Sequence, residues 1–119
     1  MQIEPEKCVF CKIISGTIPA TVVAESENAL AIRDIAPKAP MHYLFMPKVH
    51  INEITEITDL HRNIPYYLIQ LIQEVVTLHT IRDYRLVINN GIGAGQSIFH
   101  LHIHLLAGEG PGSLLRKDL

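Results

Sequence analysis

The 119-residue sequence has no apolar run approaching the roughly 20 residues that a membrane-spanning helix needs. Residues 1–7 contain no apolar stretch of the signal-peptide type, so we expect the protein to stay in the cytoplasm. An excess of one charge is also missing, because the formal net charge is −2 and no concentrated basic patch occurs. These absences argue against membranes and nucleic acids as partners. They leave room for a small anionic ligand held by backbone N–H groups and imidazoles.

Repeats, low-complexity tracts and linkers are absent as well. The length suits one compact domain, and 48% of the residues are apolar, which is enough for a hydrophobic core. We therefore expect residues 1–119 to form a single domain.

Cysteine is scarce, since Cys8 and Cys11 are the only two in the sequence. In a cytoplasmic protein, two cysteines separated by two residues favour metal binding or redox chemistry over a structural disulfide. Three interpretations remain open from the spacing alone: a zinc ligand pair, a redox pair, or two inert thiols.

The patterning along the chain predicts a small α+β domain. Its longest helical pattern spans Thr58–His79, and the main helix begins near Asn63 because Pro65 fits only a first turn. A short helix is expected at Val9–Ile14. The expected strands form a mostly antiparallel sheet of about five: Thr21–Glu25, Ala29–Arg33, His42–Met46, Tyr84–Ile88 and His100–Leu106.

The last of these segments carries three alternating histidines, His100, His102 and His104. Because strand side chains alternate between faces, the three imidazoles share one face and the intervening apolar residues share the other. The apolar face can pack on the long helix, while the imidazole face looks onto a cleft. Histidines in a strand are also found in purely structural roles, and His-x-His-x-His is a possible zinc site.

Imidazole suits phosphoryl chemistry. Its ordinary pKa of about 6.5 leaves much of it neutral and nucleophilic in the cytoplasm. A ring with one nitrogen bonded to a backbone carbonyl presents the other lone pair outward, where it can attack phosphorus and later be released by water.

A glycine-rich segment, Asn89–Ser97, leads directly into the histidines. Its alternating glycines allow sharp turns and close approach to a ligand, and successive N–H groups in such a loop can bind an anion. Gln96 and Ser97 add polar side chains beside the imidazoles. A plain hairpin connection is the alternative, and no Gly-Lys-Ser/Thr follows that would indicate a Walker loop.

These residues resemble the signature of the histidine-triad (HIT) family, most closely its Hint branch of purine nucleotide phosphoramidases. The resemblance is collinear from about Cys8 to Ala107, which we take as the core of the domain. It rests on Cys8–Gly16, Ile18–Ala20, Ile32–Pro37, Ala39–His42, Pro47–Ile51 and Gly95–Leu106.

The resemblance implies an enzyme that hydrolyses purine nucleoside phosphoramidates, or related conjugates of AMP or GMP, at the α-phosphorus. His102 would be the catalytic nucleophile and carry the nucleotidyl group, with His42 and His104 in its hydrogen-bond network, and no metal would be required for the chemistry. Asp34 would accept the ribose hydroxyls. Further substrate-binding residues are expected around the phosphate (Asn89, Gly95, Gln96 and Ser97) and around the base (Phe10, Ile13, Ile32 and Ile35). Asp34 could instead cap a turn, and the isoleucines could be ordinary core.

The resemblance also implies a structural zinc site formed by Cys8, Cys11, His50 and His100, a ligand set that suits tetrahedral zinc. It implies a homodimer in which two small sheets join into one continuous sheet. One departure concerns residues 108–119, which lack the tryptophan-bearing tail of the Hint proteins and so leave the leaving-group preference open.

Two other functions stay open at this stage. One is a non-catalytic nucleotide-binding or scaffold protein that uses the same pocket. The other is a zinc-dependent hydrolase with the metal on His100, His102 and His104.

Overall fold

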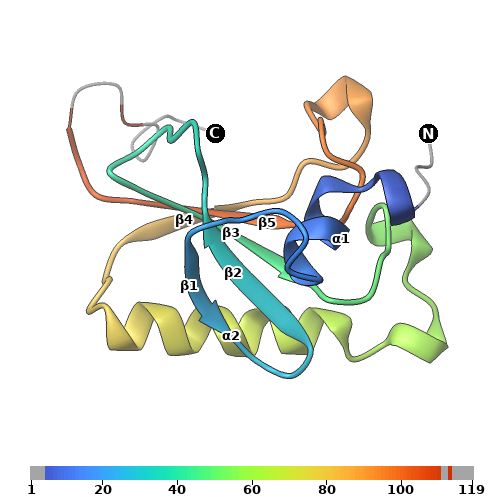
Figure 1. Ribbon diagram of the computed structural model, residues 1–119. Coiled ribbons are helices and arrows are strands. Elements are labelled where there is room, and N and C mark those ends of the chain that lie inside the picture. The colour runs from blue at the N-terminus through green and yellow to red at the C-terminus, as the bar shows by residue number, and fades with distance from the viewer. Residues whose placement is uncertain (1–4, 111–112, 114–119) are drawn as a thin grey trace.

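A five-stranded sheet forms the centre of the computed structural model, which describes residues 5–110 and residue 113 (Figure 1). The strand order is β1-β2-β3-β5-β4, and every neighbouring pair is antiparallel. The strands are β1 (Val22–Glu25), β2 (Ala29–Arg33), β3 (Met41–Pro47), β4 (Tyr84–Val87) and β5 (Ile103–Ala107). With the helices α1 (Val9–Ile14) and α2 (Ile64–Leu78), they confirm the predicted α+β class. Most of the predicted tail, residues 108–119, lies outside the described residues.

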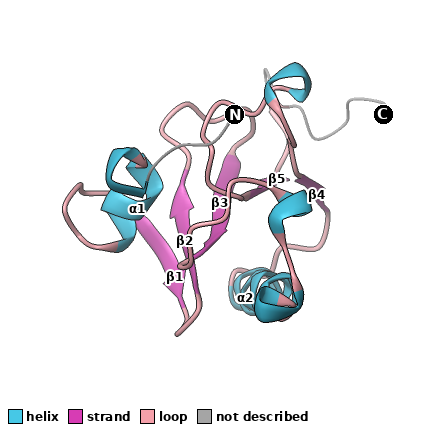
Figure 2. Cartoon of the chain, turned by 90° about the vertical axis from the view of Figure 1, so that its right-hand side faces the viewer, coloured by secondary structure: helices cyan, strands magenta, loops and turns pink. Residues whose placement is uncertain are grey.

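Helix α2 covers one face of the sheet (Figures 1 and 2). Its buried positions recur at helical spacing, and Pro65 lies in the first turn after Asn63, where a missing N–H costs nothing. Among the described residues, neither helix combines the length and the apolar composition needed to cross a bilayer. The buried residues of α2 are Ile64, Leu68, Leu71, Ile72 and Val75.

Helix α1 lies on the opposite face of the sheet (Figure 2). Phe10 from α1 packs there with Leu30, Ile32, Leu44 and Met46. Because helices cover both faces of β2, its first four residues are all buried, and its sequence is continuously apolar rather than alternating. The sheet therefore separates a large core on the α2 side from a smaller one on the α1 side.

The histidine segment departs from expectation in one respect. We predicted a strand from His100, but β5 begins at Ile103. The N–H of Leu101 donates instead to the carbonyl of Ile51, at 2.7 Å, in the segment after β3. The alternation of faces nevertheless holds, because Leu101, Ile103 and Leu105 all pack in the core on the α2 side. The alternation of faces thus begins before residue 103, where pairing with β3 starts.

Candidate active site and metal cluster

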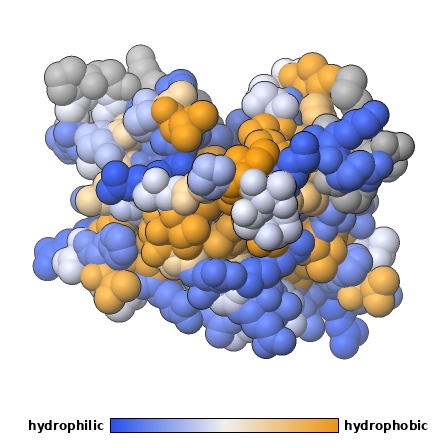
Figure 3. All heavy atoms as spheres, in the orientation of Figure 1, coloured by the Kyte–Doolittle hydropathy of each residue, from blue (hydrophilic) through white to orange (hydrophobic). Residues whose placement is uncertain are grey.

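A cavity of about 760 Å³ opens on the α1 side of the sheet. It lies between α1, the segment before β1 and the loop before β3, and Figure 3 shows hydrophobic residues around a hollow in this part of the surface. Most of the predicted substrate-binding residues line it: Phe10, Ile13, Ile32, Asp34, Ile35, His42, Asn89, Gly95, Ser97 and His104. Gln96 and His102 lie behind this lining, and each has a specific set of contacts.

His102 sits between two rings of the cavity wall. Its ring centroid is 5.1 Å from that of Phe10 and 5.0 Å from that of His104. Its Nδ1–H donates to the carbonyl of His100 at 2.7 Å, which leaves the lone pair on Nε2. Among the described residues this nitrogen has no hydrogen-bond partner, and no buried polar side-chain atom lacks one, so Nε2 reaches solvent. The nitrogen that would act as a nucleophile is therefore unprotonated and not completely buried, although His102 as a whole is only 7% exposed.

The backbone N–H of Lys38 determines where the ring protons of His42 and His104 lie. The N–H of Lys38 donates to Nδ1 of His42 at 3.0 Å, so the ring proton of neutral His42 lies on Nε2. That proton is donated to Nδ1 of His104 at 2.9 Å. The remaining proton of His104 then lies on its Nε2, and this N–H is a donor available to a ligand oxygen.

Burial keeps these imidazoles neutral. Desolvation, together with the neighbouring rings of His102 and His42, lowers the pKa of His104 to about 4. Burial likewise lowers the pKa of His42 and of His102 below the ordinary value of 6.5. At neutral pH the site therefore combines one lone-pair nitrogen with one N–H donor and no fixed positive charge on either ring.

The depressed pKa of His104 predicts a pH-dependent stability. Between pH 6.5 and about 4 the unfolded chain binds a proton at this position and the folded chain does not, so stability falls as the pH falls. We expect His104→Gln to reduce the proton uptake on unfolding in this window by up to about one proton. Urea titrations at several pH values measure how the free energy of unfolding depends on pH. His79→Gln, at an exposed position beyond α2, should keep the wild-type slope, and an unchanged slope in His104→Gln would contradict the prediction.

Asp34 makes both kinds of contact considered from the sequence, because it caps a turn and also lines the cavity. Its Oδ1 accepts from the N–H of Ala36 at 2.8 Å, which caps the turn. Its Oδ2 lies 3.4 Å from Nε2 of His42 and faces the cavity that Asp34 lines. The turn thus fixes the carboxylate while one oxygen remains directed at the site.

The predicted base-pocket residues differ in environment. Phe10 and Ile32 are buried between α1 and the sheet, and Ile13 packs against the same cluster. Ile35 is fully exposed at the cavity rim, so the alternative of an ordinary core residue is wrong for it.

Gln96 holds the glycine loop, which we define as residues 89–97. Its Oε1 accepts from the N–H of Gly91 at 2.8 Å, and its Nε2 donates to the carbonyls of Asn52 and Ile98 at 2.8 and 3.0 Å. Its own N–H donates to the carbonyl of Gly91. All its donors are used by the backbone, so Gln96 positions the loop rather than offering a donor to a ligand. Gly91 and Gly95 both have φ of 94°, which explains glycine at these two places.

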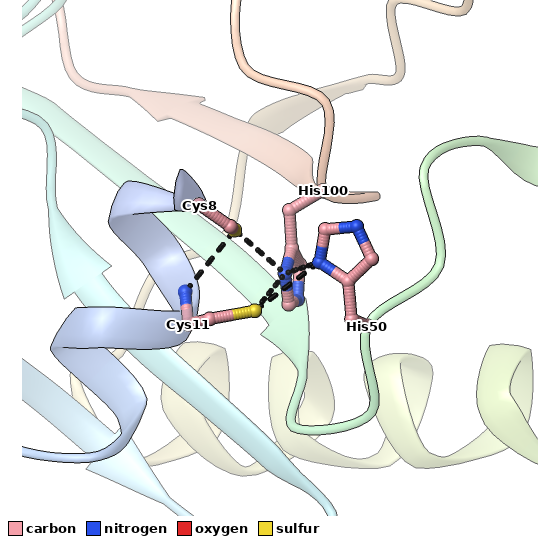
Figure 4. A group of neighbouring side chains, drawn as sticks. All are labelled: Cys8, Cys11, His50 and His100. Carbon is pink, nitrogen blue, oxygen red and sulfur yellow. Dashed lines mark hydrogen bonds between the residues drawn. The ribbon is translucent and has the colours of Figure 1, made fainter. Parts of the chain in front are cut away.

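The four predicted zinc ligands come together at the N-terminal end of α1, which Cys8 caps (Figure 4). We call Cys8, Cys11, His50 and His100 the metal cluster. Nδ1 of His100 lies 3.4 Å from Sγ of Cys8 and 3.5 Å from Sγ of Cys11. Nδ1 of His50 lies 3.1 Å from Sγ of Cys11 and 3.2 Å from Nδ1 of His100.

Hydrogen bonds outside the cluster turn the correct nitrogens inward. His100 donates Nε2–H to the carbonyl of Pro47 at 2.7 Å, and His50 donates Nε2–H to Oδ1 of Asn52 at 3.1 Å. Both Nδ1 lone pairs therefore face the two sulfurs, as expected of metal-bound histidines. Burial, reinforced by Cys8, raises the pKa of Cys11 to about 12, so a cation would have to displace its proton.

The cluster fits tetrahedral zinc. Ordinary Zn–S and Zn–N bond lengths place two nitrogens about 3.3 Å apart and a sulfur and nitrogen about 3.5 Å apart. Three of the distances in the cluster are close to these values, and the fourth, 3.1 Å from Sγ of Cys11 to Nδ1 of His50, is shorter. Cys8 and Cys11 remain free thiols in the structure, and no disulfide joins them.

A second group, Asp34, His42 and His104, is compact enough for a metal but has the wrong proton arrangement. Nε2 of His42 must carry its proton, because Nδ1 already accepts from a backbone N–H. A metal on His100, His102 and His104 together is also disfavoured, because one nitrogen of His100 faces the cysteines and the other the carbonyl of Pro47. The ring nitrogens of His100 and those of His102 and His104 thus have different sets of contacts.

Three polar residues of this region were missed in the sequence. Lys38 sets the proton on His42, Asn52 orients His50, and Glu56 accepts from both the side chain and the N–H of Asn52. The spacing of His50 and Asn52 was the available signal, since alternate residues of an extended segment point the same way. Lys38 acts through its backbone, which no side-chain pattern reveals.

Comparisons with known proteins identify the family of the chain. Residues 7–117 match the model of a family described as scavenger mRNA decapping enzyme C-term binding. A HIT-like protein of Synechococcus elongatus is 41% identical over 104 residues, covering 87% of this chain and 91% of that protein. A 14 kDa zinc-binding protein of Zea mays is 40% identical over 110 residues, covering 90% and 86%. The crystal structure of a HIT family hydrolase from Legionella pneumophila superposes with a TM-score of 0.81 at 42% identity, covering 87% and 94%.

Proposed function

The chain belongs to the histidine-triad (HIT) family, and on that premise we propose that it hydrolyses purine nucleoside phosphoramidates, or related AMP or GMP conjugates, as in the Hint branch. The observation that carries the proposal is the hydrogen bond from Nδ1–H of His102 to the carbonyl of His100. It places the lone pair on the accessible Nε2, which is the requirement for attack on phosphorus. The relative from Legionella pneumophila is named a HIT family hydrolase, which supports the same reaction class.

The reaction has two balanced steps. Nε2 of His102 attacks the α-phosphorus, an N–P bond forms, and the P–N bond to the leaving amine breaks. The amine takes a proton as it departs, and Ser97, exposed on the cavity wall, is placed to supply it. Water then attacks the phosphorus and gives up a proton that restores the hydroxyl of Ser97, the bond to His102 breaks, and the nucleoside monophosphate leaves. Nε2–H of His104 donates to a phosphoryl oxygen as its negative charge grows.

The remaining residues of the cavity bind and orient the substrate. Asn89, Gly95 and Ser97 surround the phosphate, with Gln96 holding their loop. Asp34 accepts the ribose hydroxyls through the oxygen that faces the cavity. The base lies against the apolar wall formed by Phe10, Ile13, Ile32 and Ile35.

In this proposal the metal cluster holds a structural zinc ion, and the naming of the Zea mays relative as a zinc-binding protein supports this. When bound, zinc would tie α1 to the segment after β3 and to the histidine segment. No chemical step requires it. His100 contributes its ring to the metal and its carbonyl to the nucleophile.

We also propose a homodimer. β4 lies at one edge of the sheet, where a second copy can extend the ladder. Tyr84 and Leu86 of β4 and Ile88 beyond it are 39–40% exposed, and Tyr66 and Ile69 of α2 are 61% and 42% exposed. Pairing of two β4 strands would give a continuous sheet and cover this apolar surface.

Turnover of an adenosine 5′-phosphoramidate tests the function directly. We expect release of AMP and the free amine, and a rapid acid-free quench followed by mass spectrometry should find the adenylyl group on His102. A non-catalytic nucleotide-binding protein would instead show AMP binding by calorimetry and no product above the uncatalysed rate. That second result would reject the proposed hydrolase.

A further inference from the structure

One buried side chain connects the metal cluster to the glycine loop. Asn52 lies in the segment after β3 and is only 6% exposed. Its Oδ1 accepts from Nε2–H of His50, a member of the metal cluster. Its Nδ2 and its backbone N–H both donate to Glu56, at 3.2 and 2.8 Å. The amide is therefore held in a single orientation by partners on both sides.

The backbone of the same residue carries the link onward. The carbonyl of Asn52 accepts from Nε2 of Gln96 at 2.8 Å. The other end of that carboxamide holds the N–H of Gly91, at the start of the glycine turns. A continuous hydrogen-bonded chain thus runs from His50 through Asn52 and Gln96 to the loop.

The chain of bonds is consistent with only one proton position on His50. With Nδ1 bound to a cation, the ring proton must lie on Nε2, and donation to Asn52 is satisfied. Without a cation the proton can move to Nδ1. The lone pair of Nε2 and Oδ1 of Asn52 would then face each other. Turning the amide over would restore that bond but place its oxygen against the carboxylate of Glu56.

We propose that Asn52 is a positioning residue that couples metal binding at the cluster to the order of the glycine loop. A bound cation fixes the proton of His50, and this proton fixes the side-chain amide of Asn52. The backbone carbonyl of Asn52 then holds Gln96 and, through it, the loop. The loop binds an anion, and the identification of that anion as a nucleotide phosphate rests on the proposed function. The coupling itself does not depend on turnover.

Hydrogen exchange of residues 89–97 tests the coupling without any nucleotide. In the wild-type protein, zinc loading should slow exchange of the loop amides by about tenfold, equivalent to about 1.4 kcal/mol. Asn52→Ala should lose most of this effect while still binding one zinc per chain. Asn90→Ala is the matched control, because its side chain also joins the loop to this segment, through the N–H of Ile54, but does not touch the metal cluster. Equal zinc-dependent protection in Asn52→Ala and wild type would overturn the proposal.

Two further comparisons guard against loss of folding. If zinc-free protein proves unfolded by circular dichroism, the zinc-loaded forms are compared instead, and the loop should exchange faster in Asn52→Ala than in wild type or Asn90→Ala. If Asn52→Ala does not fold, Gln96→Glu replaces it. This nearly isosteric change removes both donors of Gln96 and leaves the bond between His50 and Asn52 intact. Wild-type protection of the loop in Gln96→Glu would overturn the proposal.

Calorimetry with AMP as the probe separates the coupling from the proposed function. Zinc should raise the AMP affinity of the wild-type protein by about five- to tenfold, and that of Asn52→Ala by less than about twofold. An equal gain in both proteins would overturn the coupling. If AMP binds to neither, the proposed function fails, and the exchange measurement still decides the role of Asn52.

Discussion

His102→Ala is expected to lower turnover of an adenosine phosphoramidate by at least about a thousandfold. The reason is that Nε2 of His102 is the lone-pair nitrogen that faces solvent at the site, and the neighbouring ring cannot replace it. His104 has its lone-pair nitrogen occupied by His42 and turns an N–H outward instead. The variant should therefore lose the covalent intermediate as well as the rate. Initial rates and mass spectrometry of the quenched protein measure the two effects.

The affinity for AMP should change far less than the rate, because Asp34 and the glycine loop remain in place. His79→Ala is the control, since His79 is exposed and packs against Tyr43, a residue of the core on the α2 side. It should retain the wild-type rate. Turnover by His102→Ala within a few fold of wild type would exclude His102 as the nucleophile.

Removing the metal is expected to lower the melting temperature by about 15 °C. A ligand present at a thousand times its dissociation constant stabilises a folded protein by about 4 kcal/mol, and for a domain of this size 1 kcal/mol corresponds to roughly 4 °C. The effect should be large because four buried or half-buried ligands then lose the group that joins α1 to the sheet. Thermal unfolding with and without a strong chelator measures it, alongside an element assay for zinc.

Cys11→Ser supplies the control for this measurement. It should melt near the temperature of the chelated wild type and should not respond further to the chelator. Purified wild-type protein with well under one zinc per chain, prepared without chelator, would contradict the assignment. So would a chelator effect of equal size in Cys11→Ser and wild type.

The fold was largely predictable because its elements depend on local patterns. The helix after Asn63 follows from a proline that is tolerated only in a first turn and from apolar residues at helical spacing. The strand limits were less predictable, as the start of β5 shows. Leu101 and Ile103 have the same alternating pattern, but only Ile103 has a ladder partner on β3, and pairing partners are a property of the assembled sheet.

The candidate site was predictable where side-chain types carry the information. The sulfurs and imidazoles of the metal cluster are found together, as expected. Interactions made by the backbone were not visible in the sequence. The N–H of Lys38 sets the proton on His42, and the backbone takes up every donor of Gln96, which was expected to bind phosphate itself. Such contacts depend on how distant segments meet.

The carbonyl of His100 has a consequence for how this site tolerates change. Every amino acid provides a main-chain oxygen, so no replacement at position 100 deletes the acceptor that selects the tautomer of His102. The imidazole at the same position is, by contrast, open to mutation. A variant with packed apolar side chains in place of the thiols and imidazoles of the metal cluster would lose the proposed zinc site and keep the proposed nucleophile. Substitutions in the metal cluster can therefore change the scaffold here without removing the hydrogen bond that sets the tautomer of His102.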